Sequence, residues 1–387
     1  MTAAGPAATT AAMLAAAPPL IVLQVLPALV HGGVERGTLE IAEAVVRAGG
    51  RALVASAGGP MVPRLEALGA RHVTLPLATK NPLGILRNAS ALAALARAEG
   101  VRIIHARSRA PAWSALLAAR RSGAHFVTTY HGTYNEGLPG KRFYNSVMAR
   151  GERVIAISSF IAAHIRERHG TPAERIRVIP RGVDPEQFSP AAVAPERLAA
   201  LRAAWRLPAG RPVVMLPGRL TRWKGQGVLV EAMAGLPEAV AVLVGGGGEA
   251  FRRELEGRIA ALGLEERVRL VGHAEDMPAA LLLADIVVHA STDPEAFGRT
   301  VIEAQAMARP VVASDLGAPR ETVQQGVTGW RVRPGDPKAL ADTLRTALDL
   351  PDAARAEIGA RARAHVLRTY TTRAMQEATL DVYRELP

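Results

Sequence analysis

The sequence predicts an α/β protein built from two domains, each with a parallel β-sheet covered by helices. Short apolar runs recur along the chain, and Ala-rich stretches with helical periodicity separate them. Such alternation is typical of parallel sheets with helices on both faces. The chain has 387 residues, which is long for one hydrophobic core and suits two domains of ordinary size.

The predicted elements form two series along the chain. The expected strands of the first series are 20–26, 52–56, 73–77, 101–105, 126–130, 154–157 and 176–179, with helices including 38–48, 89–98, 111–121 and 160–169. The second series has expected strands at 213–216, 241–244, 268–271, 286–289 and 329–332, with helices including 297–308 and helices from 336 to 368. Each series is long enough to form its own sheet.

The segment 180–190 separates the two series. Its three prolines and one glycine predict a hinge-like connection. We therefore expect a first domain over 19–187 and a second over 188–369.

Residues 1–18 carry no charge and are rich in Ala, Thr and Pro. They lack the basic start of a signal peptide, and prolines interrupt the apolar run that follows, so a disordered leader is expected in place of a membrane span.

The net charge of +12 lies almost entirely in the first half of the chain. Residues 1–187 hold 22 Lys and Arg against 11 Asp and Glu, whereas the remainder holds 25 against 24. A basic surplus attracts phosphate groups in nucleic acid, in anionic lipid or in a phosphorylated acceptor. Only 4% of the residues are aromatic, and nucleic-acid surfaces use aromatic stacking. A membrane surface or an anionic acceptor is therefore favoured over nucleic acid, and a merely solvated basic face is the alternative.

The absence of cysteine bounds the chemistry. It excludes disulfides, thiolate metal sites and cysteine nucleophiles, and it is compatible with a reducing cytoplasm. The sequence also has no Asp-x-Asp triplet. We therefore expect no metal site and no cofactor.

The stretch 293–310 carries the strongest indication of chemistry. A strand ends just before the loop that contains Glu295, and Glu303 lies on the helix expected over 297–308. Free backbone N–H groups and the helix dipole make such a helix start an anion site. The amides concerned belong to Gly298, Arg299 and Thr300. The two carboxylates could hold hydroxyl groups on either side of a bound diphosphate, which is the layout of a nucleotide-sugar. Alternatively, Glu295 caps the helix and Glu303 is solvated.

Two cations flank another expected strand-to-helix turn. Arg219 and Lys224 could neutralise a diphosphate there without a metal, and an ordinary charged surface is the alternative. Glycine-rich turns at Gly32, Gly33 and Gly246 allow a backbone to approach a ligand closely, although most such turns bind nothing.

Several of these motifs resemble the donor-site signature of family 4 glycosyltransferases. The matching residues are Pro-Glu-Ala-Phe-Gly at 294–298, Glu303-Ala304 and the run 310–314. The Gly-Arg and Lys-Gly pairs within 218–225 are also similar. This retaining family has the GT-B fold, so the resemblance implies two facing Rossmann-like domains with a ligand cleft between them. It also implies that a C-terminal helix, 370–387, crosses back to the first domain.

The resemblance implies a role for each matched residue. Glu295 would hold the transferred sugar and Glu303 the ribose, while amides from Phe297 to Thr300 bind the phosphates. Arg219 and Lys224 would stabilise the leaving diphosphate. The remaining implied contacts are Gly32 and Gly33 in the cleft, His131 at the transferred sugar, Gly246 at the nucleotide and His273 at the base.

Some residues keep a structural alternative. His131 follows an expected strand, where a lone histidine is more often packed than catalytic. Asp276 and Glu321 are expected to cap helices. Ala308 stands where the family usually has glycine, and because alanine is small, only local packing is expected to change.

The implied reaction is transfer of a hexose from a UDP- or GDP-sugar to an acceptor hydroxyl with retention of configuration. We expect attack on the same face, with the departing phosphate accepting the proton, because no nucleophile paired with an acid is evident. The basic first half favours a membrane-associated or anionic glycan acceptor, such as lipopolysaccharide core. The segment 137–144 combines apolar, aromatic and basic residues and is a candidate acceptor or membrane surface.

Two alternatives remain open at this point. The chain could transfer to a soluble sugar, or it could bind nucleotide-sugars without turnover. In every case the expected partners are a nucleotide-sugar and a glycan or glycolipid acceptor, with no nucleic acid. The expected location is the cytoplasm, including the cytoplasmic face of an anionic inner membrane.

Overall fold

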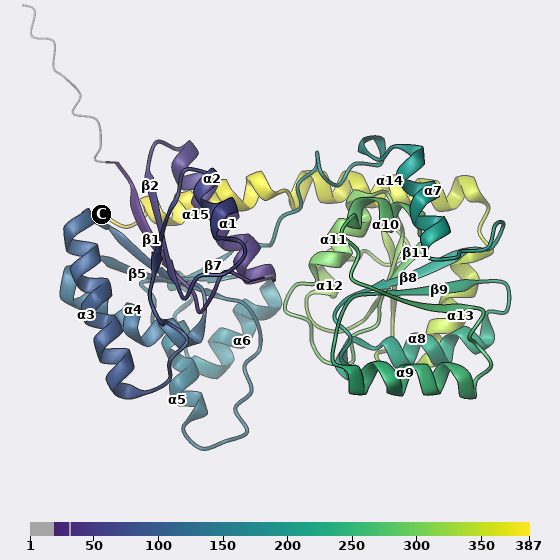
Figure 1. Cartoon of the computed structure of the whole chain (residues 1–387), viewed down its shortest axis with the longest axis horizontal. Coiled ribbons are helices and arrows are strands. Elements are labelled where there is room, and N and C mark those ends of the chain that lie inside the picture. Colours follow the sequence, from purple (N-terminus) through teal and green to yellow (C-terminus); the bar gives the residue numbers. More distant parts are fainter. Residues whose placement is uncertain (1–18, 31) are drawn as a thin grey trace, which may run out of the picture.

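The computed structural model describes residues 19–30 and 32–387 and contains two parallel β-sheets, each covered by helices (Figure 1). The leader predicted over 1–18 lies outside the described residues. The α/β class with two Rossmann-like sheets, predicted from the alternation of strands and helices, is confirmed.

Both sheets have the strand order of doubly wound nucleotide-binding domains. The first contains β1 (Ile21–Val25), β2 (Arg51–Ser56), β3 (Arg71–Thr74), β4 (Ile103–Ala106), β5 (His125–Tyr130), β6 (Arg153–Ala156) and β7 (Ile176–Val178). The second contains β8 (Val213–Pro217), β9 (Val240–Val244), β10 (Val268–Gly272), β11 (Ile286–His289), β12 (Val311–Ser314) and β13 (Gly329–Val332). The orders are β3-β2-β1-β4-β5-β6-β7 and β10-β9-β8-β11-β12-β13. In each sheet, the strand order therefore reverses beside the first strand of the series.

Helices follow most strands and cover the faces of the sheets. The first domain contains α1 (Gly33–Arg47), α2 (Val62–Ala67), α3 (Pro82–Glu99), α4 (Arg109–Ser122), α5 (Lys141–Asn145) and α6 (Ser159–His169). After it come α7 (Pro195–Ala204), α8 (Gln226–Ala232), α9 (Glu249–Ala261), α10 (Met277–Leu283), α11 (Arg299–Ala306), α12 (Pro319–Thr322), α13 (Pro337–Leu348), α14 (Asp352–Thr369) and α15 (Thr372–Arg384).

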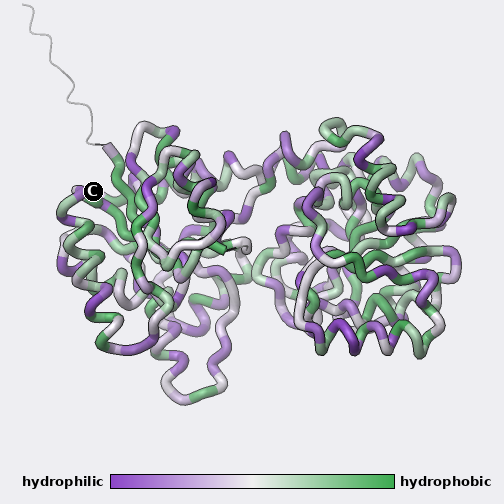
Figure 2. Tube along the Cα trace, in the orientation of Figure 1, coloured by the Kyte–Doolittle hydropathy of each residue, from purple (hydrophilic) through white to green (hydrophobic). Residues whose placement is uncertain are grey.

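The central strands of each sheet are buried on both faces, which explains their largely apolar sequences, whereas the edge strands β3, β7, β10 and β13 are partly exposed. Every residue of β8 and β9 is buried, as expected for parallel sheets that lie between helices. Figure 2 shows this pattern as hydrophobic strands at the centre of each domain, with polar residues on the outer helices. Burial of this apolar surface is the main favourable term in folding.

Two helices begin earlier than their apolar periodicity predicts. Helix α1 starts at Gly33, within the glycine turn, and not at residue 38. Helix α3 starts at Pro82, seven positions before the predicted start, because Asn81 caps it by accepting a hydrogen bond from the Leu83 N–H at 2.9 Å. An Asn cap followed by Pro is a strong start signal, and it outweighs the weak apolar pattern of the first turns.

Helix α11 is shorter at both ends than the predicted 297–308. Gly298 precedes it with a φ of 81°, and Ala308 follows it with a φ of 54°. The expectation that Ala308 affects only local packing is therefore wrong. A left-handed conformation costs a residue with a Cβ roughly 1 kcal/mol, which explains why glycine is usual at this position.

The chain crosses between the domains twice, and the two crossings lie side by side. The Val183 N–H donates to the Tyr370 carbonyl and the Thr372 N–H donates to the Val183 carbonyl, both at 2.9 Å. Helix α15 then packs against α1, where the Gln376 side chain donates to the Glu40 carbonyl at 2.7 Å. Figure 1 shows α15 running back over the first domain.

Gly182 is the closest point between these crossings and provides a test of them. A Cβ added there would lie 2.4 Å from Thr372 N and Cα. Because backbone atoms cannot give way cheaply, we expect Gly182→Ala to lower the free energy of unfolding by about 2 kcal/mol. Gly257→Ala on α9, whose added Cβ meets nothing within 4 Å, should stabilise by roughly 0.5–1 kcal/mol. Urea denaturation measures both, and equal effects of the two variants would contradict the packing argument.

Candidate functional site

The candidate site lies at the carboxyl ends of both sheets, where the two domains meet. Open parallel sheets bind ligands at the point where the strand order reverses. In the first sheet this point lies between β1 and β4, next to the Gly32–Gly33 turn. In the second it lies between β8 and β11, next to Lys224 and Glu295. Contacts across the interface, including a 2.7 Å hydrogen bond from Ser158 Oγ to the Ala296 carbonyl, bring these two edges together.

Glu295 is held by two cationic or donor groups of the second domain. It lies in the loop after β11, where Lys224 Nζ forms an ion pair with Oε2 and His289 Nε2 lies 3.4 Å from the same oxygen. Burial alone would raise the pKa of Glu295, but the His289 hydrogen bond and the Lys224 charge lower it to about 2. Glu295 is therefore a carboxylate at any physiological pH and accepts hydrogen bonds.

The start of α11 presents backbone N–H groups next to Glu295. None of the hydrogen bonds among the described residues uses the N–H of Gly298, Arg299 or Thr300. Phe297 anchors the loop, since its ring is 4% exposed and packs edge-on against Tyr370. The structure thus brings the predicted anion site and Glu295 into one loop.

Two glycine-containing turns of the second domain lie side by side. A Cβ at Gly245 would meet the Gly218 carbonyl at 2.1 Å, and the Leu220 N–H donates to the Gly246 carbonyl at 2.9 Å. Arg219 is exposed beside them, and its side chain forms no ion pair within the part of the chain that the structure describes. The charge of Arg219 is therefore uncompensated, whereas Lys224 is paired with Glu295 and keeps further N–H donors for an anion. His273 is also exposed. It follows β10, which is an edge strand of the second sheet.

Four charged side chains, Arg36, Glu40, Arg299 and Glu303, form a cluster across the domain interface. Arg36 Nη1 donates to Glu303 Oε1 at 3.0 Å, and Arg36 Nε donates to Glu40 Oε1 at 3.1 Å. Arg299 Nη2 donates to Glu40 Oε1 at 2.8 Å and its Nε lies 3.9 Å from Glu303. Each domain therefore contributes one arginine and one glutamate. A Cβ added at Gly33 would lie 3.9 Å from Arg299 Cδ.

The two arginines offset the cost of burying a charge more fully at Glu40 than at Glu303. Burial would raise the pKa of Glu40, but Arg299 and Arg36 lower it. Burial is the largest effect on Glu303, and its pKa stays raised although Arg299 and Arg36 oppose this. No hydrogen bond among the described residues reaches Glu303 Oε2. Glu303 is therefore the carboxylate that can gain most from hydroxyl donors of a ligand.

His131 lies on the first-domain side, directly after β5. Its Nδ1 is 2.6 Å from Arg181 Nη2, and its Nε2 is buried without a partner among the described residues. Arg181 and Arg107 are buried beneath it, 5% and 2% exposed. Arg181 belongs to the segment predicted to be a hinge-like connection, and its burial could not be read from the Pro and Gly residues around it.

Sequence reasoning missed other residues that the structure places here. His289 is the last residue of β11, and Arg36 and Glu40 are four positions apart on α1, a spacing that puts them on one helix face. These positions could be recognised in the sequence. The sequence did not indicate that Arg36 and Glu40 contact Glu303 and Arg299 of the second domain.

Both predicted helix caps are confirmed, one of them on a helix of the other domain. Asp276 caps α10 by accepting from the Ala279 N–H at 3.2 Å, as expected. Glu321 caps a helix of the other domain: its carboxylate accepts from the N–H groups of Ser159 at 2.9 Å and Phe160 at 2.7 Å, at the start of α6. The prediction that Glu321 caps a helix is therefore confirmed, although the capped helix is α6 and not α12, on which Glu321 lies.

The contacts of Glu295 with Lys224 and His289 should make the stability of the protein depend on pH. The pKa of Glu295 is lower in the folded chain than the ordinary value of 4.5, so its stabilising contribution is present above pH 4.5 and is lost as the pH falls toward 2. The stability difference between wild type and Glu295→Gln should therefore be largest above about pH 5, up to about 3 kcal/mol. Urea denaturation between about pH 7 and pH 3 measures it. Glu238→Gln, at an exposed glutamate, is the control, and a difference independent of pH would contradict the ion-pair argument.

Comparison with known proteins places the chain in a family. A family model described as Glycosyltransferase Family 4 matches residues 31–187, and one described as Glycosyl transferases group 1 matches residues 199–365. A D-inositol 3-phosphate glycosyltransferase of Xylanimonas cellulosilytica is 36% identical over 60% of this chain and 58% of its own length. Among the curated relatives compared, the matched share of the relative ranges from 49% to 67%.

Two solved structures match over nearly the whole chain. A glycosyltransferase from Rickettsia africae has a TM-score of 0.88 and 36% identity, covering 95% of this chain and 98% of its own. Anabaena HepE in complex with UDP-glucose has a TM-score of 0.83 and 27% identity, covering 95% and 100%. With the two facing Rossmann-like domains described above, these matches show that the chain belongs to glycosyltransferase family 4 and has the GT-B fold.

Proposed function

We propose that this protein is a retaining hexosyltransferase that uses a UDP- or GDP-sugar. The observation that carries the proposal is the arrangement around the start of α11, where Glu295, unbonded amides and Glu303 follow one another. A diphosphate on these amides would have Glu295 on one side for sugar hydroxyls and Glu303 on the other for ribose hydroxyls. The UDP-glucose bound in the structure of HepE supports a uridine nucleotide as the first donor to test.

The site suits electrostatic stabilisation of a leaving diphosphate. Breaking the anomeric bond develops negative charge on the diphosphate, and Arg219, Lys224 and the α11 amides are the donors placed to stabilise it. Glu295, with a pKa of about 2, has no proton to donate at neutral pH and so is assigned to binding sugar hydroxyls. This leaves the departing phosphate to accept the acceptor proton on the same face of the sugar. The described residues contain no cluster suited to a metal ion.

The donor pocket is tested by ligand-induced stabilisation. We expect the melting temperature of wild type to rise with one of a panel of UDP- and GDP-sugars, with UDP-glucose the leading candidate. At a ligand concentration of about 100 times Kd, the stabilisation should be about 2.7 kcal/mol. Glu303→Gln, which keeps the side-chain volume but removes the carboxylate, should lose most of this shift.

The same panel of UDP- and GDP-sugars provides the control and the result that would contradict the proposal. Glu321→Gln removes another carboxylate at the domain interface, one whose two oxygens already accept hydrogen bonds at the start of α6, and should keep the donor shift. The absence of a shift with every donor in wild type would overturn the donor assignment. A shift without any transfer to acceptors or water would instead favour nucleotide-sugar binding without turnover.

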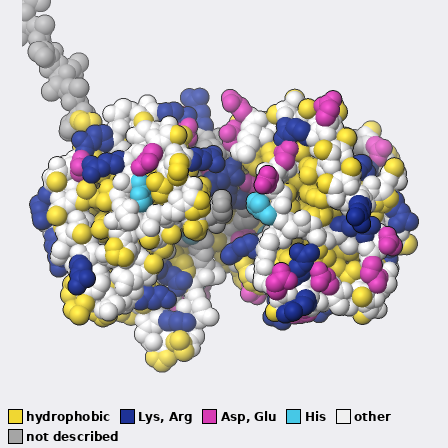
Figure 3. All heavy atoms as spheres, viewed as in Figure 1, with side chains coloured by type: hydrophobic (Ala, Val, Ile, Leu, Met, Phe, Trp, Pro, Cys, Tyr) yellow, Lys and Arg dark blue, Asp and Glu magenta, His cyan; other side chains and the backbone are white. Residues whose placement is uncertain are grey.

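For the acceptor, we propose an anionic, membrane-associated glycan. The support lies on the first domain, which holds the basic surplus. Helix α5 and the loop before it expose Leu138 (60%) and Phe143 (64%) among Lys141, Arg142 and Arg150. Figure 3 shows hydrophobic side chains at the tip of this loop, with Lys and Arg side chains above it. Apolar residues within a basic surface suit the boundary of an anionic bilayer. Within the described part of the chain, no helix is long and apolar enough to cross a bilayer.

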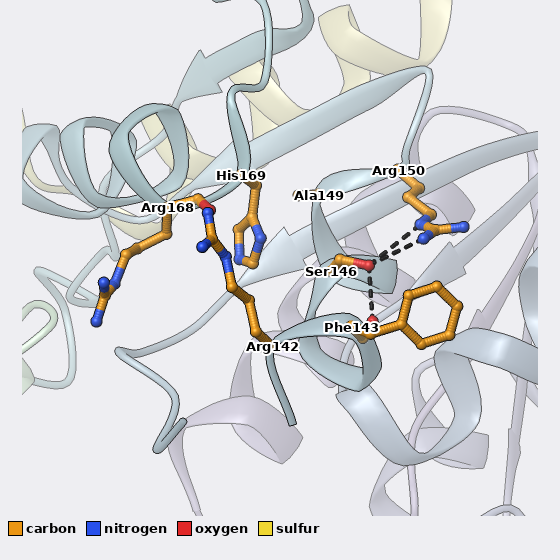
Figure 4. Close-up of a pocket in the computed structure, with 7 residues that line it drawn as sticks. All are labelled: Arg142, Phe143, Ser146, Ala149, Arg150, Arg168 and His169. Atoms are coloured by element: carbon orange, nitrogen blue, oxygen red, sulfur yellow. Dashed lines mark hydrogen bonds between the residues drawn. The ribbon is translucent and has the colours of Figure 1, made fainter. Parts of the chain in front are cut away.

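A pocket of about 430 Å³ lies beside this tip, and its lining includes three arginines, Arg142, Arg150 and Arg168 (Figure 4). Arg150 donates to Ser146 Oγ at 3.1 Å and stacks over the Phe143 ring at 5.1 Å, and Arg142 donates to the Arg168 carbonyl at 2.7 Å. Arg142 and Arg150 are thus held in place by neutral partners, which leaves their charge for an anion, whereas Arg168 forms an ion pair with Glu136 at 3.6 Å. The inositol phosphate in the names of the curated relatives supports a second candidate, a soluble phosphorylated acceptor.

Vesicle binding separates these two acceptors. Wild type should sediment with vesicles that contain phosphatidylglycerol and not with neutral phosphatidylcholine vesicles. Phe143→Ser should weaken this binding about tenfold, because it removes an aromatic side chain that would be buried in the bilayer when the protein is bound. Leu262→Ser, an exposed leucine of the second domain, should have no effect. If wild type does not bind anionic vesicles, the membrane acceptor is contradicted and phosphorylated soluble acceptors are the candidates to assay.

A further inference from the structure

The contact between Arg181 and His131 fixes which nitrogen of the imidazole carries the proton. Arg181 Nη2 lies 2.6 Å from His131 Nδ1. A guanidinium has only donors and keeps its proton in proteins, so the Nδ1 atom must accept the hydrogen bond with its lone pair. A neutral ring in this contact therefore carries its proton on Nε2.

The surroundings of His131 keep the ring neutral. Burial lowers its pKa well below the ordinary value of 6.5, and the charges of Arg181 and Arg107 lower it further. The other groups facing this region are His105 on β4, whose Nδ1 bonds Tyr383 on α15 at 2.6 Å, and Tyr134, which contacts the His131 backbone.

Charges from the remaining elements do not reverse this conclusion. Glu40 on α1 acts electrostatically on both Arg181 and Arg107, and Arg299 on α11 acts on Arg181. The ion pairs among the described residues do not include Arg181, Arg107 or His131. The imidazole therefore meets two guanidinium groups and no carboxylate, and an imidazolium would be repelled by both.

The protonated nitrogen is the one that lacks a partner. His131 Nε2 is buried and makes no hydrogen bond among the described residues. A buried N–H without an acceptor is unusual and calls for a partner. The loop that holds Arg181 also touches the donor side, because Arg299 Nη2 donates to the Gly182 carbonyl at 3.1 Å. His131 is thus connected through two hydrogen bonds to the start of α11.

We propose that Arg181 is a positioning residue that fixes His131 as the neutral Nε2–H tautomer, so that His131 donates a hydrogen bond to an oxygen of the bound nucleotide-sugar. In this role His131 is neither a general base nor a cation. The identity of the ligand rests on the proposed function, whereas the tautomer and its cause do not. No further proton transfer is involved, since the Nε2 proton stays on the ring.

The tautomer is measured directly on the ligand-free protein. We would label the histidines with ¹⁵N, record long-range ¹H–¹⁵N spectra, and assign His131 by the signals lost in His131→Gln. Wild type should show an unprotonated Nδ1 and a protonated Nε2, unchanged between about pH 5.5 and pH 8, where an unperturbed histidine titrates. A protonated Nδ1, or a ring that titrates in this range, would overturn the proposal.

Variants then test Arg181 as the cause. Arg181→Met should give mixed tautomers or a ring that titrates within the same range. Arg181→Lys keeps a charged donor and should retain the Nε2–H tautomer. The control is Arg309→Met, which removes another largely buried arginine, one that donates to the Leu282 carbonyl in the second domain, and it should leave His131 unchanged. An unchanged His131 spectrum in Arg181→Met would also overturn the proposal.

Turnover separates this inference from the proposed function. With a productive donor, Arg181→Met should lower kcat about tenfold or more and introduce a pH dependence that wild type lacks, with KM little changed. Loss of kcat without any new pH dependence would overturn the positioning role. If wild type itself turns over no donor, the proposed function fails, while the tautomer result stands or falls on the spectra alone.

Discussion

The relative position of the two domains depends on the charge cluster formed by Arg36, Glu40, Arg299 and Glu303. Each domain supplies one cation and one anion, and the closest pair of each arginine crosses the interface, Arg36 with Glu303 at 3.0 Å and Arg299 with Glu40 at 2.8 Å. Removing one partner of a buried pair leaves an uncompensated charge, which costs several kcal/mol in well-buried examples. The cluster therefore sets the orientation of the first-domain glycine turn against the start of α11, and the candidate donor site exists only where that orientation is kept.

The same cluster links domain contact to ligand binding. Glu303 accepts one short hydrogen bond, from the opposite domain, and is the less compensated of the two carboxylates. A ligand hydroxyl on Glu303 would compete with Arg36 for Oε1 or would take the open Oε2. A ligand can shift a conformational equilibrium only by its different affinity for the two states. Competition at Glu303 would supply such a difference, because it changes a contact that spans the domain interface.

The fold could be predicted from the sequence because it rests on local signals. Apolar runs mark the buried strands, and the Pro and Gly residues of 180–190 mark the change of series. Where helix starts were misjudged, as at Gly33 and Pro82, a cap or a glycine turn outweighed the apolar periodicity. The left-handed Ala308 was missed because a backbone angle leaves no trace in composition. Element type was thus predictable, whereas ends and strained positions were not.

The candidate site was predictable only within each domain. Glu295, Glu303 and Lys224 follow strand ends in a recognisable pattern, and the structure brings them to one edge of the second sheet. Partners supplied by the other domain were not visible: the contacts of Arg36 with Glu303 and of Arg299 with Glu40 join residues 267 and 259 positions apart. Arg181 was hidden in another way, because its segment has the composition of an exposed connection although the side chain is buried.

The balance of buried charge at the interface points to an anionic ligand. Among the described residues, the buried Arg107 and Arg181 and the partly buried Arg36 and Arg299 face two carboxylates, those of Glu40 and Glu303. Buried charges are normally paired, and burial lowers the pKa of both Arg107 and Arg181 without removing their charge at neutral pH. The excess positive charge lies beside the start of α11, whose dipole adds to it. A bound diphosphate carries the charge needed to balance this region, so the feature that is costly in the free protein is complementary to the ligand that the site is proposed to bind.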